Sequence, residues 1–336
     1  MKFKHVIYFY YIIFFLLILE SYYIIKRLYN PIIISIDTSA KNMKGGPRAF
    51  IKGINQILPF CWNRCCFFSS SKINHYFKPD LFFIPYPRFN EKQFNLFIVN
   101  GSVYKLILGP IFVPKKWNAF PNQKIWMERR FSDILNLVKG IAVHTNRVRD
   151  YLAKRSKNLF NLKKFKIIRP CSNLRPKIVT NFIERKNDII FYEKYADLNR
   201  SKQGSLLFNL FKNTTKKVIP IKYGTYNKTI MKKIANNSKF IIYFSFFDTG
   251  AIGLKEFQNY GVISFFHQKE FITDKKSSFY IPELSNENNI DIAFKKIMNI
   301  IEKISKLNIQ TQLIAKKNQI HNKCENSLID LCKSIF

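Results

Sequence analysis

The chain has 336 residues, of which 47% are hydrophobic, so it is long enough for two domains with a sizeable core and is not wholly disordered. Its 56 Lys and Arg residues against 21 Asp and Glu residues give a formal net charge of +35. This charge favours polyanionic partners, such as nucleic acid, acidic lipid or phosphorylated ligands, although a biased genome explains the same composition.

The N-terminal segment contains an unbroken apolar run from Val6 to Leu19, which resumes at Tyr22 and ends at Ile25. A helix over this run spans about 30 Å, the thickness of the hydrocarbon core of a bilayer. We therefore predict that residues 1–29 form an N-terminal transmembrane helix that anchors the protein in a membrane. A cleaved signal peptide is one alternative, although no small-x-small cleavage site follows the run. A buried core helix is the other.

The basic residues that flank the apolar run predict its orientation. Lys2 and Lys4 precede it, and five basic residues follow it: Lys26, Arg27, Lys41, Lys44 and Arg48. Because cytoplasmic flanks carry the excess of Lys and Arg, we expect a single-pass protein whose main body is cytoplasmic and lies against the membrane. The sequons at Asn100, Asn213, Asn227 and Asn236 do not decide the orientation, because a chain so rich in Asn contains several by chance.

The main body begins with Ile32–Ile36, which is continuously apolar, as expected of a strand covered on both faces. A loop with Gly45 and Gly46 leads to a helix predicted over Arg48–Leu58, and this order opens an α/β unit. Residues 30–176 are predicted to form a Rossmann-like domain. Its further strands are predicted at Leu81–Ile84, Leu96–Val99, Lys105–Leu108, Gly140–Val143 and Lys166–Ile168, and its further helices at Phe131–Val138 and Asn146–Ala153.

A mixed, polar linker is predicted at residues 177–187, and the strand–helix pattern then restarts. Residues 188–285 are predicted to form a second Rossmann-like domain, and residues 286–336 to form C-terminal helices. The fold class is therefore α/β, with two facing doubly wound domains whose ligand lies at the carboxyl ends of the strands. The strands of the second domain are predicted at Asp188–Phe191, Lys217–Ile221, Phe240–Phe244 and Val262–Phe266, and its helices at Ser205–Phe211, Asn227–Ile234 and Gly253–Asn259.

The cysteines are too few and too irregularly spaced to indicate a disulfide scaffold. No paired CxxC motif is present, so a zinc ribbon is not expected, and neither is any other metal site. Free thiols in a reducing compartment fit this pattern. The six residues are Cys61, Cys65, Cys66, Cys171, Cys324 and Cys332.

The most informative stretch runs from Phe240 to Phe266. In it an apolar strand leads to Asp248, Gly250 and Gly253, and the helix that follows carries Glu256 eight positions after Asp248. Glycine lets a ligand approach the backbone closely, and the first turn of a helix attracts a diphosphate. The two carboxylates are spaced to hold the two ends of an extended, hydroxyl-rich ligand.

The segment Asp248-Thr-Gly-Ala-Ile-Gly-Leu-Lys-Glu256 resembles the motif of the retaining glycosyltransferases of the GT-B fold, the glycosyltransferase-4-like group. In that motif seven residues separate an acidic residue, usually Glu, from a second Glu. Here Asp248 takes the first place. The resemblance extends to Tyr260–Ile263, to Gly140–Leu152 and to Ile167–Pro170, and it touches most of residues 32–270.

The resemblance implies that Glu256 binds the ribose of the donor, that Asp248 binds the transferred sugar, and that the second domain holds the nucleotide sugar. The first domain would then bind the acceptor. Catalysis in this family generally needs no metal, and no other cofactor is expected. The remaining residues implied to bind the donor are Gly45, Gly46, Lys194, Arg200, Lys202, Gly250, Ala251 and Gly253.

Each of these assignments has a structural alternative. An acidic pair at this spacing also occurs on solvated helix faces, the glycine pair also forms plain turns, and the basic candidates are only three of 56. One interpretation of His144 and Trp126 places them at the acceptor site. The structural interpretation makes His144 a histidine at a strand end and Trp126 a core residue, which is the default for a tryptophan.

The sequence thus predicts a membrane-bound, retaining and metal-independent glycosyltransferase that moves a hexose or related sugar. The donor would be a nucleotide-diphosphate sugar, and the acceptor a glycan or a lipid-linked molecule. The alternatives are a non-catalytic GT-B-like protein and a basic protein that binds nucleic acid or another polyanion. Nucleic acid is not the expected partner, because no RNP, zinc-finger or helix-turn-helix signature is present.

Overall fold

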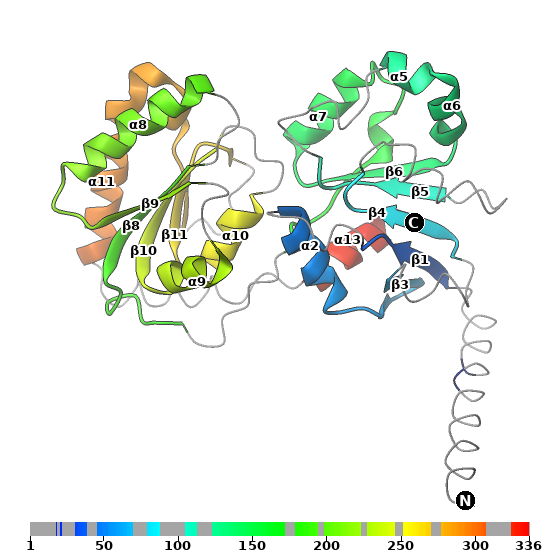
Figure 1. Ribbon diagram of the computed structural model, residues 1–336, viewed down its shortest axis with the longest axis horizontal. Helices are drawn as coiled ribbons and strands as arrows, with labels where there is room; N and C mark the ends of the chain where they lie inside the picture. Colours follow the sequence, from blue (N-terminus) through cyan, green and yellow to red (C-terminus); the bar gives the residue numbers. More distant parts are fainter. Residues whose placement is uncertain are drawn as a thin grey trace, which may run out of the picture.

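The computed structural model shows two α/β halves that lie side by side (Figure 1). We call residues 31–171 together with 324–335 the N-half, and residues 179–306 the C-half. The structure describes residues 18, 21, 31–38, 46–69, 79–87, 105–112, 123–171, 179–193, 198–222, 227–245, 251–269, 277–306 and 324–335.

The N-half is built on a seven-stranded sheet in the order β2-β3-β1-β4-β5-β6-β7. All neighbouring pairs are parallel except β2 and β3, which form a hairpin. The strand order reverses at β1, which lies between β3 and β4, as in a doubly wound domain. The strands are β1 (Ile32–Ile36), β2 (Phe60–Trp62), β3 (Cys65–Ser69), β4 (Leu81–Ile84), β5 (Lys105–Leu108), β6 (Val138–Val143) and β7 (Phe165–Ile167).

Helices cover both faces of this sheet, which is why its central strands are apolar throughout. On one face, Phe50 and Ile54 of one helix and Leu328 and Leu331 of another are buried against the strands. On the other face, Trp126 of one helix packs with apolar residues of two further helices. It is fully buried and is therefore a core residue. The helices are α2 (Gly46–Asn55) and α13 (Glu325–Ile335) on the first face, and α5 (Gln123–Met127), α6 (Arg129–Leu135) and α7 (Asn146–Arg155) on the second.

The C-half is built on a five-stranded, fully parallel sheet in the order β12-β11-β10-β8-β9. Numbered along the chain, this is the order 2-1-3-4-5 of flavodoxin-like folds, with its reversal between β8 and β10. Pro220 lies on the edge strand, where a missing backbone N–H is tolerated. The strands are β8 (Asn187–Glu193), β9 (Val218–Lys222), β10 (Ser238–Phe244), β11 (Ile263–Phe266) and β12 (Ser278–Tyr280).

Two pairs of helices cover the faces of the second sheet. Helices α8 (Leu198–Lys212) and α11 (Ile290–Lys306) bury Leu207, Phe211 and one side of α11 on one face. Helices α9 (Lys228–Asn236) and α10 (Ile252–Gln258) bury Met231 and Phe257 on the other. The expected C-terminal helices therefore divide between the halves, because α11 packs on the C-half and α13 on the N-half.

Arg185, in the predicted linker, fixes the start of the C-half. Its buried guanidinium donates hydrogen bonds to the carbonyl oxygens of Thr180 at 3.1 Å, Ser238 at 2.8 Å, Tyr260 at 2.5 Å and Gly261 at 3.1 Å. Burial lowers the pKa of Arg185 to about 10, so the group stays charged at neutral pH. The end of the linker is thus held on the segments that begin β10 and β11.

The halves touch through α10 and α2, which lie against each other (Figure 1). Ile252 of α10 belongs to the apolar cluster of the N-half, together with Phe50 and Ile54 of α2. The chain crosses between the halves twice, because α13 returns to the N-half and contacts both β7 and β2. These two strands are the opposite edges of the sheet, so α13 spans its whole face.

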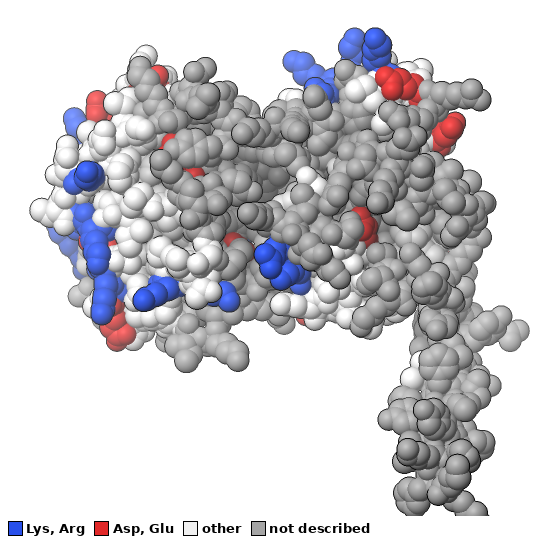
Figure 2. Space-filling model, in the orientation of Figure 1, with Lys and Arg blue, Asp and Glu red and all other residues white. Residues whose placement is uncertain are grey.

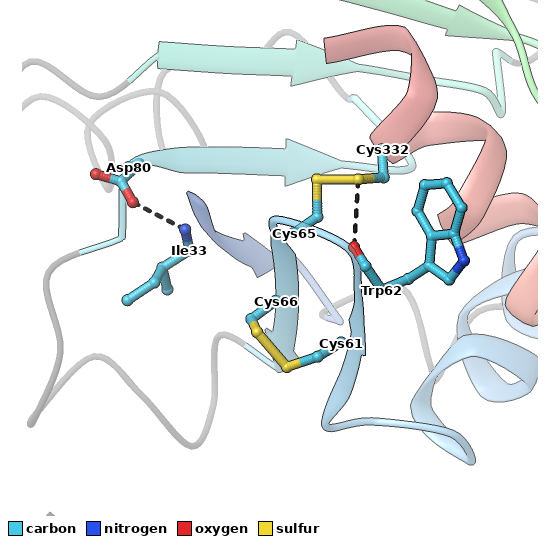
Figure 3. Close-up of a disulfide and its surroundings, with 7 residues drawn as sticks. All are labelled: Ile33, Cys61, Trp62, Cys65, Cys66, Asp80 and Cys332. Atoms are coloured by element: carbon cyan, nitrogen blue, oxygen red, sulfur yellow. Dashed lines mark hydrogen bonds between the residues drawn. A yellow bond between two sulfur atoms is a disulfide. The ribbon is translucent and has the colours of Figure 1, made fainter. Parts of the chain in front are cut away.

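All six cysteines are paired, so the expectation of free thiols is wrong. Cys61–Cys66 joins the β2–β3 hairpin, Cys65–Cys332 joins β3 to α13 (Figure 3), and Cys171–Cys324 joins the segment after β7 to the start of α13. The last two pairs are separated by 267 and 153 residues. Such pairs are brought together only by the return of α13, which no spacing in the sequence indicates.

The predicted strands and helices of both halves are largely confirmed. The helix expected at Phe131–Val138 ends at Leu135, because Val138 already begins β6. The β2–β3 hairpin and β12 were not predicted, and the strand expected at Leu96–Val99 lies outside the described residues. So does the predicted anchor, apart from Ile18 and Ser21. Within the described part of the chain, no helix is long and apolar enough to span a membrane.

Candidate functional site

The strand order of the C-half reverses between β8 and β10, and this reversal marks the candidate site. Glu193, the last residue of β8, pairs with Phe244, the last residue of β10. The chain then leaves β8 for α8 on one face and leaves β10 for α10 on the other face. Loops that diverge in this way open a crevice beyond the carboxyl ends of the strands, where open α/β sheets bind their ligands.

Two stacked tyrosines support α10 at this point. Tyr192 of β8 and Tyr243 of β10 are buried, with ring centroids 5.0 Å apart and planes 7° apart. A Cβ atom added to Gly253 would lie 3.4 Å from the Tyr192 hydroxyl and 3.9 Å from the Tyr243 hydroxyl. Gly253 therefore lets α10 lie close to the tyrosines, and a side chain larger than a methyl group would push the helix away.

Ala251 begins the turn into α10 in the left-handed conformation, with φ 45° and ψ 40°. It is fully buried. This conformation costs an L-residue about 1–2 kcal/mol, and strained backbone of this kind gathers at ligand-binding turns. The implied donor-binding residue Ala251 thus occupies a turn whose shape is held by its surroundings.

We expect Ala251→Gly to change the free energy of unfolding by less than about 1 kcal/mol, because the relief of the left-handed strain offsets the greater entropy of glycine in the unfolded chain. Ala235→Gly is the matched control, a buried alanine inside α9, and it should cost about 1 kcal/mol or more. Ala251→Val should be worse than both, since β-branched residues are outliers at positive φ. Urea unfolding measures all three. Equal costs for the two glycine variants would contradict the strained turn.

Glu256 lies on α10 and is only 2% exposed. A ribose-binding carboxylate is expected to face a solvated cleft when no donor is bound, and the structure corrects this expectation for Glu256. Its charge acts on Tyr260, whose pKa is raised by burial first and by the Glu256 carboxylate second. A carboxylate this deeply buried is uncommon unless polar groups hold it, so Glu256 is a specific feature of α10 and not part of a solvated helix face.

Lys255, the neighbour of Glu256, was not predicted as a site residue from the sequence. It follows Ile252 by one turn, on the side of α10 that meets α2, and it is 7% exposed. Burial lowers the pKa of Lys255 to about 7. The signal in the sequence was a lysine one turn after Ile252, between the apolar residues Leu254 and Phe257.

The loops beyond β10 and β11 are tied to each other. Gln268 donates a hydrogen bond to the Ser245 carbonyl oxygen at 2.8 Å, and both residues are buried. Among the residues that the structure describes, the Ser245 hydroxyl has no hydrogen-bond partner. A buried polar atom without a partner is costly, and this one stands where the chain enters the segment of Asp248.

The other predicted site residues are distributed as follows. Gly46 begins α2, and Arg200 and Lys202 lie in α8, of which the backbone alone is described there. Gly45, Lys194, Asp248 and Gly250 lie outside the described residues. The structure therefore places Ala251, Gly253 and Glu256 together on α10 and its first turn. No cluster of His, Cys, Asp or Glu side chains that would hold a metal ion occurs in the described ranges.

The N-half carries an open pocket of about 360 Å³ beyond β6 and β7, with α13 as its other wall. His144 Nδ1 lies 3.0 Å from the Ile168 carbonyl oxygen, which fits a structural histidine at a strand end. Arg169 and Asp330 form an ion pair of 3.1 Å at its rim. The pocket is lined by His144, Ile167, Ile168, Arg169, Pro170, Asp330 and Lys333.

The chain is similar to solved structures of glycosyltransferases. One is TarM of S. aureus in a complex that contains UDP, with 15% identity and a TM-score of 0.48 over 76% of this chain and 55% of that one. Another is the catalytic domain of starch synthase IV from Arabidopsis thaliana bound to ADP and acarbose, with 10% identity and a TM-score of 0.46 over 77% and 73%. A third is an α1,3-fucosyltransferase, with 13% identity and a TM-score of 0.41 over 90% and 88%.

This chain spans about half the length of the TarM structure. No protein-family model matches the sequence, and no curated protein matches it. The two doubly wound sheets observed here have the architecture that the resemblance to the GT-B fold implies.

Proposed function

We propose that this protein is a glycosyltransferase that binds a nucleotide-diphosphate sugar at the carboxyl ends of β8 and β10. The buried carboxylate of Glu256 carries the proposal. It lies on the helix that follows the strand at the reversal of the sheet, eight positions after Asp248. An extended donor with a ribose at one end and a sugar at the other matches two acidic residues at this spacing.

In the proposed reaction, the hydroxyl oxygen of the acceptor attacks the anomeric carbon of the donor sugar. The bond from that carbon to the diphosphate breaks on the same face on which the hydroxyl arrives, and the nucleotide diphosphate that leaves takes the acceptor proton. Negative charge grows on the leaving diphosphate, so cations placed there stabilise the transition state more than the bound donor. Lys194, Arg200 and Lys202 are the proposed cations, and the reaction is proposed to retain the anomeric configuration.

The acceptor is proposed to bind on the N-half, where the pocket beyond β6 and β7 is the candidate. Arg169, Asp330 and Lys333 give it charged groups of both signs, and Ile167 and Ile168 give it apolar surface. Such a lining suits a glycan or a lipid-linked head group. We also propose that Val6–Ile25 anchors the protein in a membrane.

A protein that only binds polyanions is the competing function. On the face drawn in Figure 2, the Lys and Arg side chains of the described residues form several groups with uncharged residues between them. A polyanion binder would not require a carboxylate pair or a strained turn beside it. The observations at α10 therefore favour the enzyme.

The test is release of nucleotide diphosphate by purified protein from a panel of nucleotide-diphosphate sugars. We expect release from one donor above the rate without protein, and we expect EDTA to leave the rate unchanged, because cationic side chains take the place of a metal at the diphosphate. No release from any donor would favour a binding protein. A rate that is lost in EDTA and restored by Mn²⁺ or Mg²⁺ would contradict a metal-independent phosphate site.

A further inference from the structure

All six cysteines form disulfides, and this pairing indicates the compartment in which the main body of the protein folds. Disulfides form and persist in oxidising compartments and are rare in the cytosol. Cys65, Cys332, Cys171 and Cys324 are buried, and their pairing joins α13 to the rest of the N-half. Each pair loses two electrons and two protons to a disulfide-bearing oxidant by thiol–disulfide exchange.

The flanking charges oppose an oxidising compartment only weakly. The residues next to the apolar run are balanced, with Lys2 and Lys4 on one side and Lys26 and Arg27 on the other. The excess on the C-terminal side arises from residues further along, and long domains cross a membrane largely regardless of their charge. The disulfides therefore outweigh the charge pattern that predicted a cytoplasmic body.

Asn213 lies in an exposed N-x-Thr sequon. The sequon Asn213-Thr214-Thr215 follows α8 in a turn, and both Asn213 and Thr215 are exposed. Among the residues that the structure describes, the middle residue is the one engaged through its side chain in this sequon: the Thr214 hydroxyl donates to the Phe211 carbonyl oxygen at 2.7 Å and accepts from the Lys216 N–H at 3.2 Å. A sequon on a surface turn in a secreted chain is an N-glycosylation acceptor.

The sequon at Asn236 is the internal contrast. Its side-chain oxygen accepts a hydrogen bond from the Thr180 N–H at 2.9 Å, and its side-chain nitrogen donates to the Thr180 hydroxyl at 2.8 Å. Ser238, the third residue of that sequon, is fully buried and donates to the Ile234 carbonyl oxygen at 2.7 Å. A glycan on Asn236 would break the contact that holds Thr180.

We propose that the main body of this protein lies on the oxidising side of a secretory membrane, where Asn213 carries an N-linked glycan and Asn236 does not. The donor is a lipid-diphosphate-linked oligosaccharide. The Asn213 side-chain nitrogen forms the new bond to the anomeric carbon and loses a proton, and the bond from that carbon to the lipid diphosphate breaks. The proposal does not depend on the activity of the protein.

The experiment expresses the full chain in eukaryotic cells and compares its electrophoretic mobility before and after treatment with peptide-N-glycosidase. The untreated chain should stay with membranes in carbonate, and it should gain mobility on treatment. Thr215→Ala, which keeps Asn213, should remove one glycan. Ser238→Ala, the matched change in the Asn236 sequon, should leave the number of glycans unchanged even if it lowers stability.

Thiol alkylation without reductant gives the second measurement on the same samples. We expect no alkylated cysteine in the untreated chain and six after reduction, as the three disulfides require. A chain with six free thiols and no glycan would overturn the proposal. Intact disulfides with the same number of glycans in Thr215→Ala and in the unaltered chain would overturn the assignment of Asn213.

Discussion

Glu256→Gln is expected to raise the KM for the donor by roughly 10- to 150-fold, with little change in kcat. A carboxylate that accepts hydrogen bonds from two ribose hydroxyls contributes about 1.5–3 kcal/mol, because hydrogen bonds to charged acceptors are the stronger ones. Each 1.4 kcal/mol corresponds to about a tenfold change in affinity. Gln keeps the shape of the side chain and removes its charge, so the loss reports on the charge. Steady-state kinetics with a varied donor measures the effect.

Asp248→Asn should have the complementary effect, with a fall in kcat and a smaller change in KM. Asp248 is proposed to hold the sugar that moves, and an interaction that strengthens in the transition state appears in kcat. Glu302→Gln is the control for both variants, since Glu302 is an exposed residue of α11. Unchanged donor kinetics in Glu256→Gln would show that the spacing of the two carboxylates has no catalytic meaning.

The burial of Glu256 requires a separate measurement of its surroundings. The Glu256 charge is the second cause of the raised pKa of Tyr260, after burial. Glu256→Gln should therefore lower the pKa of Tyr260 but leave it above the ordinary value. Titration of tyrosinate absorbance, compared with Tyr260→Phe, follows this group without any donor. If the pKa of Tyr260 falls in Glu256→Gln as expected and the donor kinetics also change, the kinetic loss is assigned to donor binding and not to misfolding.

Removal of both disulfides of α13 is expected to lower the free energy of unfolding by roughly 9 kcal/mol in the entropic account, about 4–5 kcal/mol for each bond, because each bond closes a loop of more than 100 residues. The variant replaces Cys65, Cys332, Cys171 and Cys324 by Ala, which keeps the buried sites apolar. Leu328 and Leu331 of α13 are fully buried on the sheet, so the helix should stay in place with a lower stability. Urea unfolding measures the change.

The matched control removes the Cys61–Cys66 pair, whose cysteines are only five positions apart. Closing so short a loop contributes about 2 kcal/mol in the same entropic account. The control should therefore lose less than half as much stability as the four-cysteine variant. Equal losses, or no loss in the four-cysteine variant, would show that α13 is held by its apolar contacts alone.

Much of the fold could be predicted from local sequence patterns. The run Ile32–Ile36 and the run Phe240–Phe244 are continuously apolar because helices cover both faces of their sheets, and the structure has a strand at each. The order of strands and helices along the chain then predicts two doubly wound units. The position of Glu256 on a helix after an apolar strand was visible in the same way, since it depends on neighbours in the sequence.

The sequence by itself thus determined the α/β class, the two sheets and the helix that carries Glu256, because hydrophobic periodicity and turn residues act over a few positions. Only the tertiary structure decided the three disulfides, the return of α13 to the N-half and the burial of Glu256 and Lys255. Each of these depends on contacts between residues far apart in the chain. Cys65 meets Cys332 only because α13 returns to the N-half, and Lys255 is buried on α10, the helix that contacts α2. Burial and pairing of this kind are properties of packing, and spacing along the chain does not encode them.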